Sequence, residues 1–357
     1  MTLAVLIIGL ALVAVTALSR VRSARWWIRA ADFPRAQIAV GLVLTLAAFA
    51  PYASSSSIAD IGFALALIAA LGYQLSRIWP YTPIAPRQVL PATPGDDGRT
   101  IRILIWNVLM QNREARAFLD LVHAQSPDVI LLLETDAWWD EALRGLDGAY
   151  AHAIRHPLEN EYGLHLFSRL GLIAPQLEFL VEPDIPSVRA GVRLRSGDVI
   201  VFHGLHPRPP LPQQDAEPRD AEILMVGRQV KPHAACTIVA GDLNDVAWSD
   251  TTRLFQRLSG MLDPRRGRGL FNTFHAGYPL LRWPLDHVFH GAGFTLVGLR
   301  RLPRTGSDHF PVLVDLKYTP EDAGRHETEQ ADRQDQAEAQ ERIVEGLDAA
   351  TRRNGSP

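Results

Sequence analysis

The first 80 residues contain three long apolar runs, and this feature constrains the fold more than any other. Thr2–Ser19, Ala36–Ala53 and Ile58–Trp79 consist largely of apolar residues. Each run is about long enough for a helix that crosses the hydrocarbon core of a bilayer. Only the four serines 54–57 separate the last two runs, which suits a tight turn between antiparallel helices. We therefore expect a membrane region over residues 1–80, with three transmembrane helices at about 2–19, 36–53 and 58–79.

The first run could instead be a cleaved signal peptide. A signal peptide begins with basic residues, which are missing before the first run, and two further apolar runs follow. We therefore expect the first run to be retained as a span.

The connection between the first two runs is rich in arginine. Asp32 is its one acidic residue, and Trp26 and Trp27 are typical of a membrane interface. Basic connections stay on the cytoplasmic side, and three spans place everything after Trp79 on that same side. We therefore favour a cytoplasmic over a periplasmic location for the rest of the chain, although one miscounted span would reverse it. The arginines are Arg20, Arg22, Arg25, Arg29 and Arg35.

Composition divides the rest of the chain into three parts. Prolines and glycines mark residues 81–98 as an extended linker. Residues 99–318 mix short apolar runs with helical periodicity, which predicts an α/β sandwich. Residues 319–357 are rich in Glu, Asp, Gln and Arg, so we expect a solvated tail, disordered or partly helical. The predicted strands include Ile101–Ile105, Val129–Leu133, Val199–Phe202 and Thr237–Ala240, and the predicted helices are Arg113–Gln125 and Arg219–Val230.

Charge and cysteine content add two limits. The net charge of −3 gives no overall positive field for a polyanion such as nucleic acid. The single cysteine, Cys236, lies in an apolar run, so we interpret it as a small core residue that forms no internal disulfide.

Polar residues of catalytic type follow several predicted strands. Asn107 ends the first strand, and Glu134 follows the uncharged run Leu131–Leu133. A single carboxylate at a strand end suits a hard cation such as Mg²⁺, which takes few protein oxygens and keeps several waters. A surface charge or a helix cap would show the same pattern, so Glu134 on its own is weak evidence.

Two histidines, His203 and His206, lie three residues apart at the end of another strand and so face opposite sides. His206 begins a proline-rich loop that can hold an imidazole rigidly against a phosphate. Arg208 is close enough in the sequence to bind an anion. We predict that His206 contacts substrate, and a pair of ordinary loop histidines is the alternative.

The most specific segment is Ile238–Asp245. Gly241 lets the chain turn at a strand end, and Asp242 and Asn244, two residues apart, point the same way. One can polarise water while the other donates to a phosphoryl oxygen. A simple turn stabilised by the Asp side chain is the alternative.

Two Asp-His pairs lie beside apolar residues further along, at Asp286-His287 and Asp308-His309. A carboxylate that orients a histidine fixes its tautomer and raises its basicity, as a general base near neutral pH requires. These pairs therefore predict acid–base chemistry.

Taken in order, the motifs resemble those of the endonuclease/exonuclease/phosphatase superfamily over about Ile101–Leu316. The superfamily contains DNase-type nucleases, apurinic endonucleases, neutral sphingomyelinases and inositol polyphosphate 5-phosphatases, and the chain looks closest to a bacterial branch with N-terminal membrane spans. The resemblance implies a four-layered α/β sandwich of two mixed sheets, with a metal at one end of the cleft, in a bacterial inner membrane. The motifs are WN at 106–107, LLLET at 131–135, YGLHLFSR at 162–169, HPRPP at 206–210, GDLND at 241–245, LDH at 285–287 and SDHFP at 307–311.

The resemblance also implies metal ligands and substrate contacts. Asn107 and Glu134 would bind Mg²⁺ or Mn²⁺, and Asp308 would be a further metal ligand or a partner of a histidine. His206 would contact the scissile phosphate. The side chains that would support this substrate contact are Glu161, Tyr162 and Arg208.

The remaining roles concern the attacking water. Asp242 would orient or activate it, and Asn244 would hold a phosphoryl oxygen. His309 would be the general base, with Asp286 as the acid that orients it. His287 would be structural.

Together these features predict a membrane-anchored, divalent-metal-dependent phosphodiesterase or phosphatase in which water attacks phosphorus in line. The substrate class stays open between phospholipid, nucleic acid and a small phosphate ester, and no protein partner is identified. A tethered DNA or RNA endonuclease is the alternative, for which Arg265, Arg266 and Arg268 offer a modest phosphate-binding patch against the simpler interpretation of a solvated loop. A non-catalytic binding module that retains the fold is a third possibility.

Overall fold

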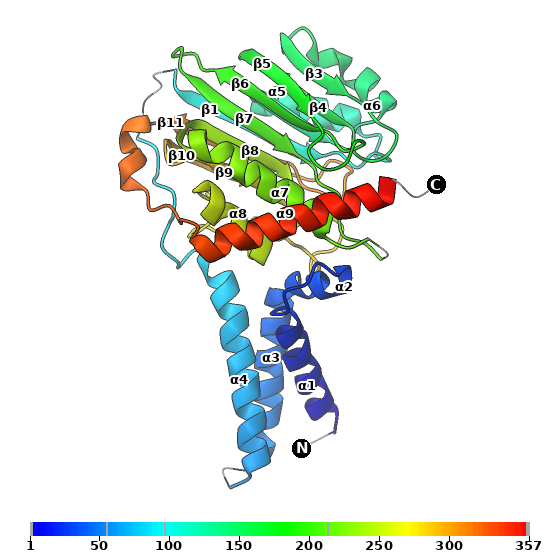
Figure 1. Cartoon of the computed structure of the whole chain (residues 1–357), viewed down its shortest axis with the longest axis vertical. Helices are drawn as coiled ribbons and strands as arrows, with labels where there is room; N and C mark the ends of the chain where they lie inside the picture. Colours follow the sequence, from blue (N-terminus) through cyan, green and yellow to red (C-terminus); the bar gives the residue numbers. More distant parts are fainter. Residues whose placement is uncertain (1–2, 55, 94, 96–97, 213, 355–357) are drawn as a thin grey trace.

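A computed structural model describes residues 3–54, 56–93, 95, 98–212 and 214–354. Three N-terminal helices lie side by side below a two-sheet domain, as Figure 1 shows. They are α1 (Leu3–Leu18), α3 (Arg35–Phe49) and α4 (Ile58–Ile78). Short helices α2 (Trp26–Arg29) and η1 (Ala30–Asp32) connect α1 to α3 next to the domain, and η2 (Ala50–Tyr52) and η3 (Trp79–Tyr81) follow α3 and α4.

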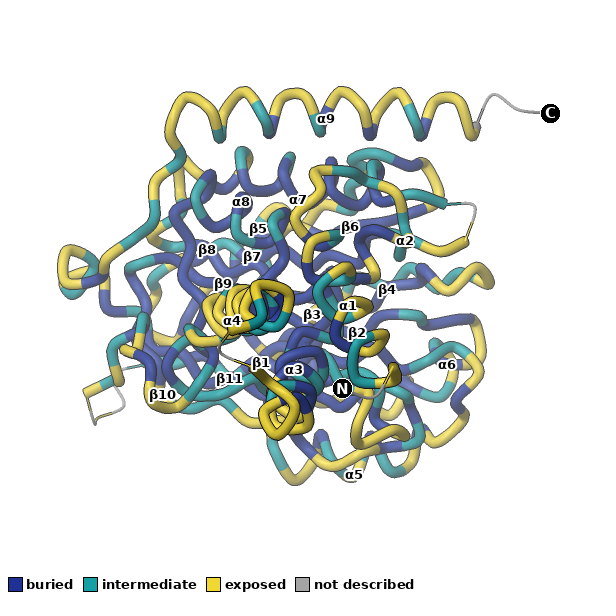
Figure 2. The backbone as a smooth tube through the Cα atoms, turned by 90° about the horizontal axis from the view of Figure 1, so that it is seen from below, coloured by how far each residue is buried: buried dark blue, intermediate teal, exposed yellow. Residues whose placement is uncertain are grey.

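The three helices pack through small and aromatic residues. Phe49 and Phe63 meet edge to face with ring centroids 5.1 Å apart. A Cβ at Gly9 would lie 2.4 Å from the Phe63 ring, so glycine is needed for the close approach of α1 and α4. Many of their other apolar side chains are exposed, and α4 shows mostly exposed residues when viewed from below (Figure 2).

Two of the three expected spans meet a length and hydropathy criterion for crossing a membrane. They are Arg35–Tyr52 and Ile58–Tyr81, while Leu3–Leu18 is apolar but shorter. At 1.5 Å per residue a 16-residue helix is about 24 Å long, less than a typical hydrocarbon core. The structure therefore does not establish three spans. Thr2, in the first expected span, and Ser55, in the serine link, lie outside the described residues.

The domain contains two mixed sheets that pack face to face. One has the strand order β10 (Phe294–Arg301), β11 (Val312–Tyr318), β1 (Thr100–Asn107), β2 (Val129–Leu133), β4 (Leu164–Ser168) and β3 (His152–His156). The other has the order β5 (Gly171–Glu178), β6 (Ser187–Arg193), β7 (Val199–Leu205), β8 (Thr237–Asp242) and β9 (Asp286–His290). Both sheets combine parallel and antiparallel pairs. The predicted α/β sandwich of two mixed sheets is confirmed.

Alternation along the strands divides the core into layers. On β1, Ile103 and Ile105 face the opposite sheet, whereas Leu104 and Trp106 face helices on the outside. Those helices are α5 (Ala115–Gln125), α6 (Ala137–Ala142) and η4 (Leu143–Leu146). The second sheet is covered by α7 (Glu217–Val230), η5 (Lys231–Cys236) and α8 (Asp250–Ser259). The layer order is helix, sheet, sheet, helix.

The linker and the tail both lie against the domain. In the linker, Val89 is buried in the core between the sheets, and Ala92 donates a backbone hydrogen bond to Leu296. The tail contains η6 (Pro320–Arg325) and the long helix α9 (Arg333–Asn354), which runs across α7 and α8 (Figure 2). Ala339 and Ile343 of α9 are buried against them. Pro94 of the linker and the last tail residues, 355–357, lie outside the described residues.

Sparse apolar residues are enough to dock α9, because they recur on one face and ion pairs flank them. Arg257 of α8 binds Asp335 through two hydrogen bonds of 2.8 Å. Of the two forms expected for the tail, the structure shows the helical one. Cys236 is half-buried at the end of η5 and not in the core, because the buried strand begins one residue later.

Candidate active site

Strand register brings the sequence-predicted residues together. In the first sheet Asn107 pairs with Leu133 in parallel, so Glu134 emerges beside Asn107. In the second, Leu205 pairs with Gly241 in parallel, so His206 emerges beside Asp242. The two sheets thus present their polar strand ends at one edge of the sandwich.

Gly241 is required at this edge. Its φ is 144°, and a Cβ there would lie 1.9 Å from the carbonyl oxygen of Leu205. Glu134, Glu161 and Asn244 also have positive φ values, of 60°, 69° and 49°. Such backbone is costly for residues with a side chain and is concentrated at functional sites.

Asn107 and the Glu134 and Asp242 carboxylates form the centre of the site. The Asn107 amide group donates to Glu134 Oε1 at 2.7 Å and to Asp242 Oδ2 at 3.1 Å. Its oxygen accepts from the backbone N–H of Leu109 at 3.0 Å. The backbone N–H of Met110 lies 3.3 Å from Glu134 Oε2. Asn107 therefore orients two carboxylates at once.

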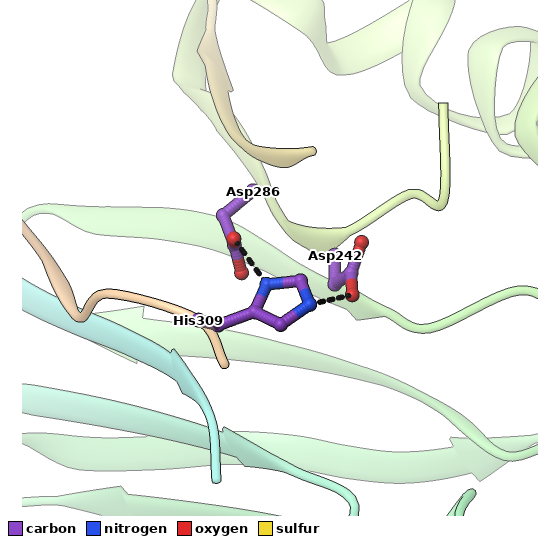
Figure 3. A group of neighbouring side chains, drawn as sticks. All are labelled: Asp242, Asp286 and His309. Atoms are coloured by element: carbon purple, nitrogen blue, oxygen red, sulfur yellow. Dashed lines mark hydrogen bonds and ion pairs between the residues drawn. The ribbon is translucent and has the colours of Figure 1, made fainter. Parts of the chain in front are cut away.

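His309 lies between two acids (Figure 3). Its Nδ1 is 2.8 Å from Asp286 Oδ2, and its Nε2 is 3.5 Å from Asp242 Oδ2. Asp286 is buried behind the ring, where the Thr273 hydroxyl accepts from its backbone N–H at 3.2 Å. This arrangement fixes the imidazole and directs Nε2 towards the cleft.

Burial and neighbouring charge shift the titration of these groups. Burial alone would lower the pKa of His309, but Asp286 and Asp242 outweigh it and raise the pKa to about 10. Burial raises the pKa of Glu134 to about 7 and that of Asp242 to about 6. Although burial opposes the effect, His309 holds the pKa of Asp286 below its usual range. The site thus carries crowded carboxylates whose charge one histidine only partly offsets.

His206 lies near the same Asp242 oxygen as His309. Its Nε2 is 4.0 Å from Glu134 Oε1 and 3.9 Å from Asp242 Oδ2. Burial lowers the pKa of His206 to about 3, so its imidazole is neutral. Its buried Nδ1 has no hydrogen-bond partner among the described residues. His206 is therefore a neutral side chain with an unused polar atom at the site.

Asn244 and Asp308 complete the polar side of the cleft. The Asn244 amide donates to the carbonyl of Pro207 at 3.0 Å, and its backbone N–H donates to Asp242 at 2.9 Å. Asp308 also lines the cleft. His287, expected to be structural, is buried away from the cleft between Arg265 and the carbonyl of Asp245.

The three expected supporting residues lie near one another but differ in position. Glu161 and Tyr162 line the cleft. Arg208 is not among the lining residues, because Glu182 and Asp184 bind its guanidinium at 3.0 and 2.8 Å. The guanidinium lies over the Tyr162 ring at 4.7 Å. Arg208 thus supports Tyr162 and does not face the cleft.

The arginines considered as a nucleic-acid patch are all engaged. Arg265 is buried in an ion pair with Asp263 at 2.7 Å, and Arg266 binds Glu329 at 2.6 Å. Arg268 donates to the carbonyls of Pro264 and Val89. Each of these three side chains binds a neighbouring segment. The arginines therefore form neither a phosphate-binding patch nor a freely solvated loop.

The cleft has a volume of about 520 Å³ and a second wall that sequence analysis missed. This wall contains apolar residues from the segment between α1 and α3 and from residues 274–285. A tryptophan beside an apolar run is interpreted as a membrane-interface residue, so no sequence signal assigned Trp26 to the cleft. The missed lining residues are Trp26, Ala30, Phe33, Pro34, Pro209, Pro210, Leu211, Phe274, Trp283 and Leu285.

The residues at the site fit a hard divalent cation. Besides burial, the carboxylates of Asp242 and Asp308 lie close enough to Glu134 to raise its pKa. No Lys or Arg is among the described residues that line the cleft. Asp242, Asp286 and His309 also form a compact group whose ligand atoms lie within 4.8 Å of one another. Asp286, however, is enclosed behind His309, so the oxygens nearer the cleft suit Mg²⁺ better.

Comparisons with known proteins agree with this geometry. Residues 104–309, more than half of the chain, match the model of the Endonuclease/Exonuclease/phosphatase family. No curated protein matched the sequence.

Several solved structures share the fold. An endonuclease/exonuclease/phosphatase from Beutenbergia cavernae has 20% identity and a TM-score of 0.51, over 62% of this chain and 72% of that chain. D. rerio TDP2 complexed with a single-strand DNA product has 17% identity and a TM-score of 0.51, over 62% and 100%. The human Nocturnin catalytic domain with a bound sulfate anion has 18% identity and a TM-score of 0.50, over 63% and 97%. With the family match and the carboxylate-histidine site at its strand ends, this chain belongs to the endonuclease/exonuclease/phosphatase family.

Proposed function

We propose that this chain is a membrane-anchored, divalent-metal-dependent phosphoesterase that hydrolyses a phosphate ester by in-line attack of water. The observation that carries the proposal is His309, held between the carboxylates of Asp286 and Asp242 at the edge where Glu134 and Asp308 also converge. That set provides both a proton acceptor and oxygen ligands for a cation, which this reaction requires.

Glu134 and Asp308 would hold Mg²⁺ or Mn²⁺, and Asn107 would keep the Glu134 carboxylate in place. When bound, the cation neutralises charge that develops on the phosphoryl group and the leaving oxygen. The backbone N–H of Met110 gives Glu134 a second fixed contact.

Asp242 and His309 would act on water as one unit. Asp242 orients the water, and the Asp242–His309 pair takes up its proton, because the two groups are in contact at 3.5 Å. Asp286 is a positioning residue that holds the imidazole through Nδ1. The nucleophile is water, so no covalent enzyme intermediate is needed.

The substrate phosphate would lie between His206 and Asn244. His206 has a buried Nδ1 without a hydrogen-bond partner among the described residues, and the Asn244 side chain is fixed by its hydrogen bond to the carbonyl of Pro207. Tyr162 and Glu161 would contact the rest of the substrate, with Arg208 supporting the Tyr162 ring.

Exposed apolar helices support the membrane anchor. The windows of α3 and α4 that meet the span criterion are only 33% and 22% buried, so these are not core helices of a soluble fold. A large exposed apolar surface on a monomer marks a membrane or protein contact. The domain and the arginine-rich connection lie at the same end of the bundle, which favours a cytoplasmic domain (Figure 1).

A metal-dependent activity panel on the detergent-solubilised chain tests the proposal. Bis-p-nitrophenyl phosphate, plasmid DNA, phospholipid and phosphomonoesters are each incubated with Mg²⁺, Mn²⁺ or EDTA, and Asp242→Ala and His309→Ala serve as controls. We expect metal-dependent hydrolysis of at least one ester, lost in both variants. Wild-type activity in both variants would refute the assigned site, and no hydrolysis of any substrate would favour a non-catalytic module.

A further inference from the structure

The apolar wall of the cleft comes from the membrane-proximal part of the chain. Trp26, Phe33 and Pro34 line it, and all three lie between α1 and α3. Phe274, Trp283 and Leu211 of the domain line the same cleft. The catalytic side chains therefore share one cleft with residues placed next to the helices that are apolar enough to cross a bilayer.

The membrane-proximal segment is built into the domain. Arg29 lies 3.5 Å from Asp220 and donates to the Thr251 hydroxyl at 2.7 Å, and both groups are buried. The Trp248 indole donates to the carbonyl of Asp32 at 2.7 Å. The backbone N–H of Trp26 donates to Asp215 at 2.9 Å. These buried contacts fix the wall relative to the catalytic edge, so it is part of the site.

Aromatic contacts connect the wall to the catalytic histidine. Phe33 meets the Trp283 ring edge to face at 5.7 Å, Trp283 stacks on Phe274 at 6.3 Å, and Phe274 lies 4.9 Å from the His309 ring. The buried indole Nε1 of Trp283 has no acceptor among the described residues. A ligand with an apolar chain and an oxygen-rich head would match this wall and supply that acceptor.

The loop that precedes Trp283 carries exposed apolar side chains beside the bundle. Leu280 is 83% exposed, and its carbonyl accepts from Gln37, near the start of α3, at 2.8 Å. Tyr278 and Leu281 on the same loop are also exposed, as is Leu211, which lines the cleft. If α3 enters a bilayer, this loop lies at the level of the lipid headgroups.

We propose that the substrate is a phosphate ester of a membrane lipid. Its headgroup phosphate reaches His309 and Glu134, and the start of its apolar chain lies along Trp26, Phe33 and Trp283. This assignment rests on the proposed hydrolase function and adds the substrate class. A volume of about 520 Å³ is large enough for a ligand of this kind.

A polyanion fits the same cleft poorly. Its described lining contains Glu134, Glu161, Asp242 and Asp308 but no Lys or Arg. Nucleic-acid sites depend on basic residues that neutralise successive phosphates and on aromatic rings that stack bases. Here the rings lie beside the segment between α1 and α3, and no basic side chain among the described lining residues is available to bind a second phosphate.

Adjacent tryptophans provide a matched test. The full chain is reconstituted in vesicles of phosphatidylethanolamine and phosphatidylglycerol, and lipid hydrolysis is compared with hydrolysis of bis-p-nitrophenyl phosphate and a single-stranded oligonucleotide. We expect Trp26→Gln and Phe33→Gln to lower the ratio of lipid to soluble-diester kcat/KM by about tenfold, the effect of losing apolar contact in a pocket. Trp27→Gln is the control, since Trp27 is 44% exposed and does not line the cleft.

Each result separates this inference from the proposed function. Hydrolysis of the soluble diester without hydrolysis of lipid, preferential cleavage of the oligonucleotide, or an unchanged ratio in Trp26→Gln would overturn the lipid assignment and leave a hydrolase. If no substrate is cleaved, the proposed hydrolase function is refuted. Lipid binding to the apolar wall can then still be tested by photolabelling. A phosphatidylglycerol with a photoreactive acyl chain should label residues 274–285 in wild type and less in Phe33→Gln, and equal labelling would overturn the inference.

Discussion

The two walls of the cleft differ in chemistry and in origin. The polar wall is formed by strand ends of the sandwich, where Glu134, Asp242 and His309 converge. The apolar wall combines Trp26 and Phe33 of the segment between α1 and α3 with Trp283 of a long loop. The sandwich edge can supply the chemistry of phosphoester hydrolysis, whereas the added wall can select what is hydrolysed. Specificity in this chain is therefore expected to depend on residues outside the family-matched segment.

The largest effect is expected on the polar wall. His309→Gln removes the imidazole from the Asp242–His309 pair that takes up the proton of water, so kcat should fall by about 10²- to 10⁴-fold, the usual contribution of acid–base catalysis. The matched control is His203→Gln, because His203 is a buried histidine on β7 that does not line the cleft. Equal loss in both variants would show a general packing effect instead of catalysis.

Metal dependence tests a second part of the polar wall. Glu134→Gln keeps the hydrogen bond with Asn107 possible but weakens cation binding, so the Mg²⁺ concentration for half-maximal activity should rise at least about tenfold. Thermal stabilisation by Mn²⁺ should shrink in parallel. Glu159→Gln is the control, since Glu159 is an exposed carboxylate that accepts from the backbone of Ala137. Wild-type metal dependence in Glu134→Gln would exclude Glu134 as a ligand.

The connection between the walls is tested by Arg29→Met. Asp220 and Asp245 are buried and would lose a positive partner at 3.5 and 4.0 Å. Leaving a buried charge unpaired costs about 3–5 kcal/mol, and because Arg219 stays 2.7 Å from Asp220 and 3.6 Å from Asp245, the loss should be smaller than that but still lower the unfolding midpoint in detergent. Arg25→Met should leave it unchanged, because Arg25 is exposed. A wild-type midpoint in Arg29→Met would mean that the segment is not fixed to the domain.

The smallest effect is expected in the pH dependence of folding stability, through the buried histidine His203. Burial lowers the pKa of His203 to about 4, so between about pH 6.5 and pH 4 the unfolded chain binds more protons at this residue than the folded chain. The contribution of His203 to the free energy of unfolding is therefore highest above about pH 6.5 and falls by roughly 1 kcal/mol per pH unit as the pH decreases towards about 4. Denaturant titrations at pH 7.5 and pH 5 should therefore show a smaller pH difference for His203→Gln than for wild type. An identical pH difference would contradict the assigned shift.

The polar wall could be predicted from sequence because most of its residues lie within a few residues of the end of a short apolar strand. Runs such as Val129–Leu133 and Thr237–Ala240 are buried on both faces and therefore continuously apolar, so the sequence alone shows where these strands end. The order of the strands in each sheet could not be predicted, because no local sequence pattern indicates which strands pair. Parallel pairing of β7 with β8 is what sets His206 beside Asp242.

The apolar wall could not be predicted, for a different reason. Trp26 and Phe33 sit beside apolar runs, where aromatic residues usually mark a membrane interface. Their place in the cleft depends on Arg29, whose partner Asp220 is nearly 200 residues away in the sequence. The packing of helix α9 against the domain could not be predicted either, because its few buried apolar residues, such as Ala339 and Ile343, do not indicate a buried face in so charged a segment.

A chain-length series tests most directly whether both walls serve one substrate. Short-chain phospholipids with the same headgroup and increasing acyl length are kept below their micelle concentrations, and kcat/KM is measured for wild type and Trp26→Gln. The two-wall cleft predicts that wild-type kcat/KM rises with each added methylene, by up to about fourfold for a group worth about 0.8 kcal/mol when buried, and that the rise flattens in the variant. The same kcat/KM across the series, or the same rise in both proteins, would contradict it.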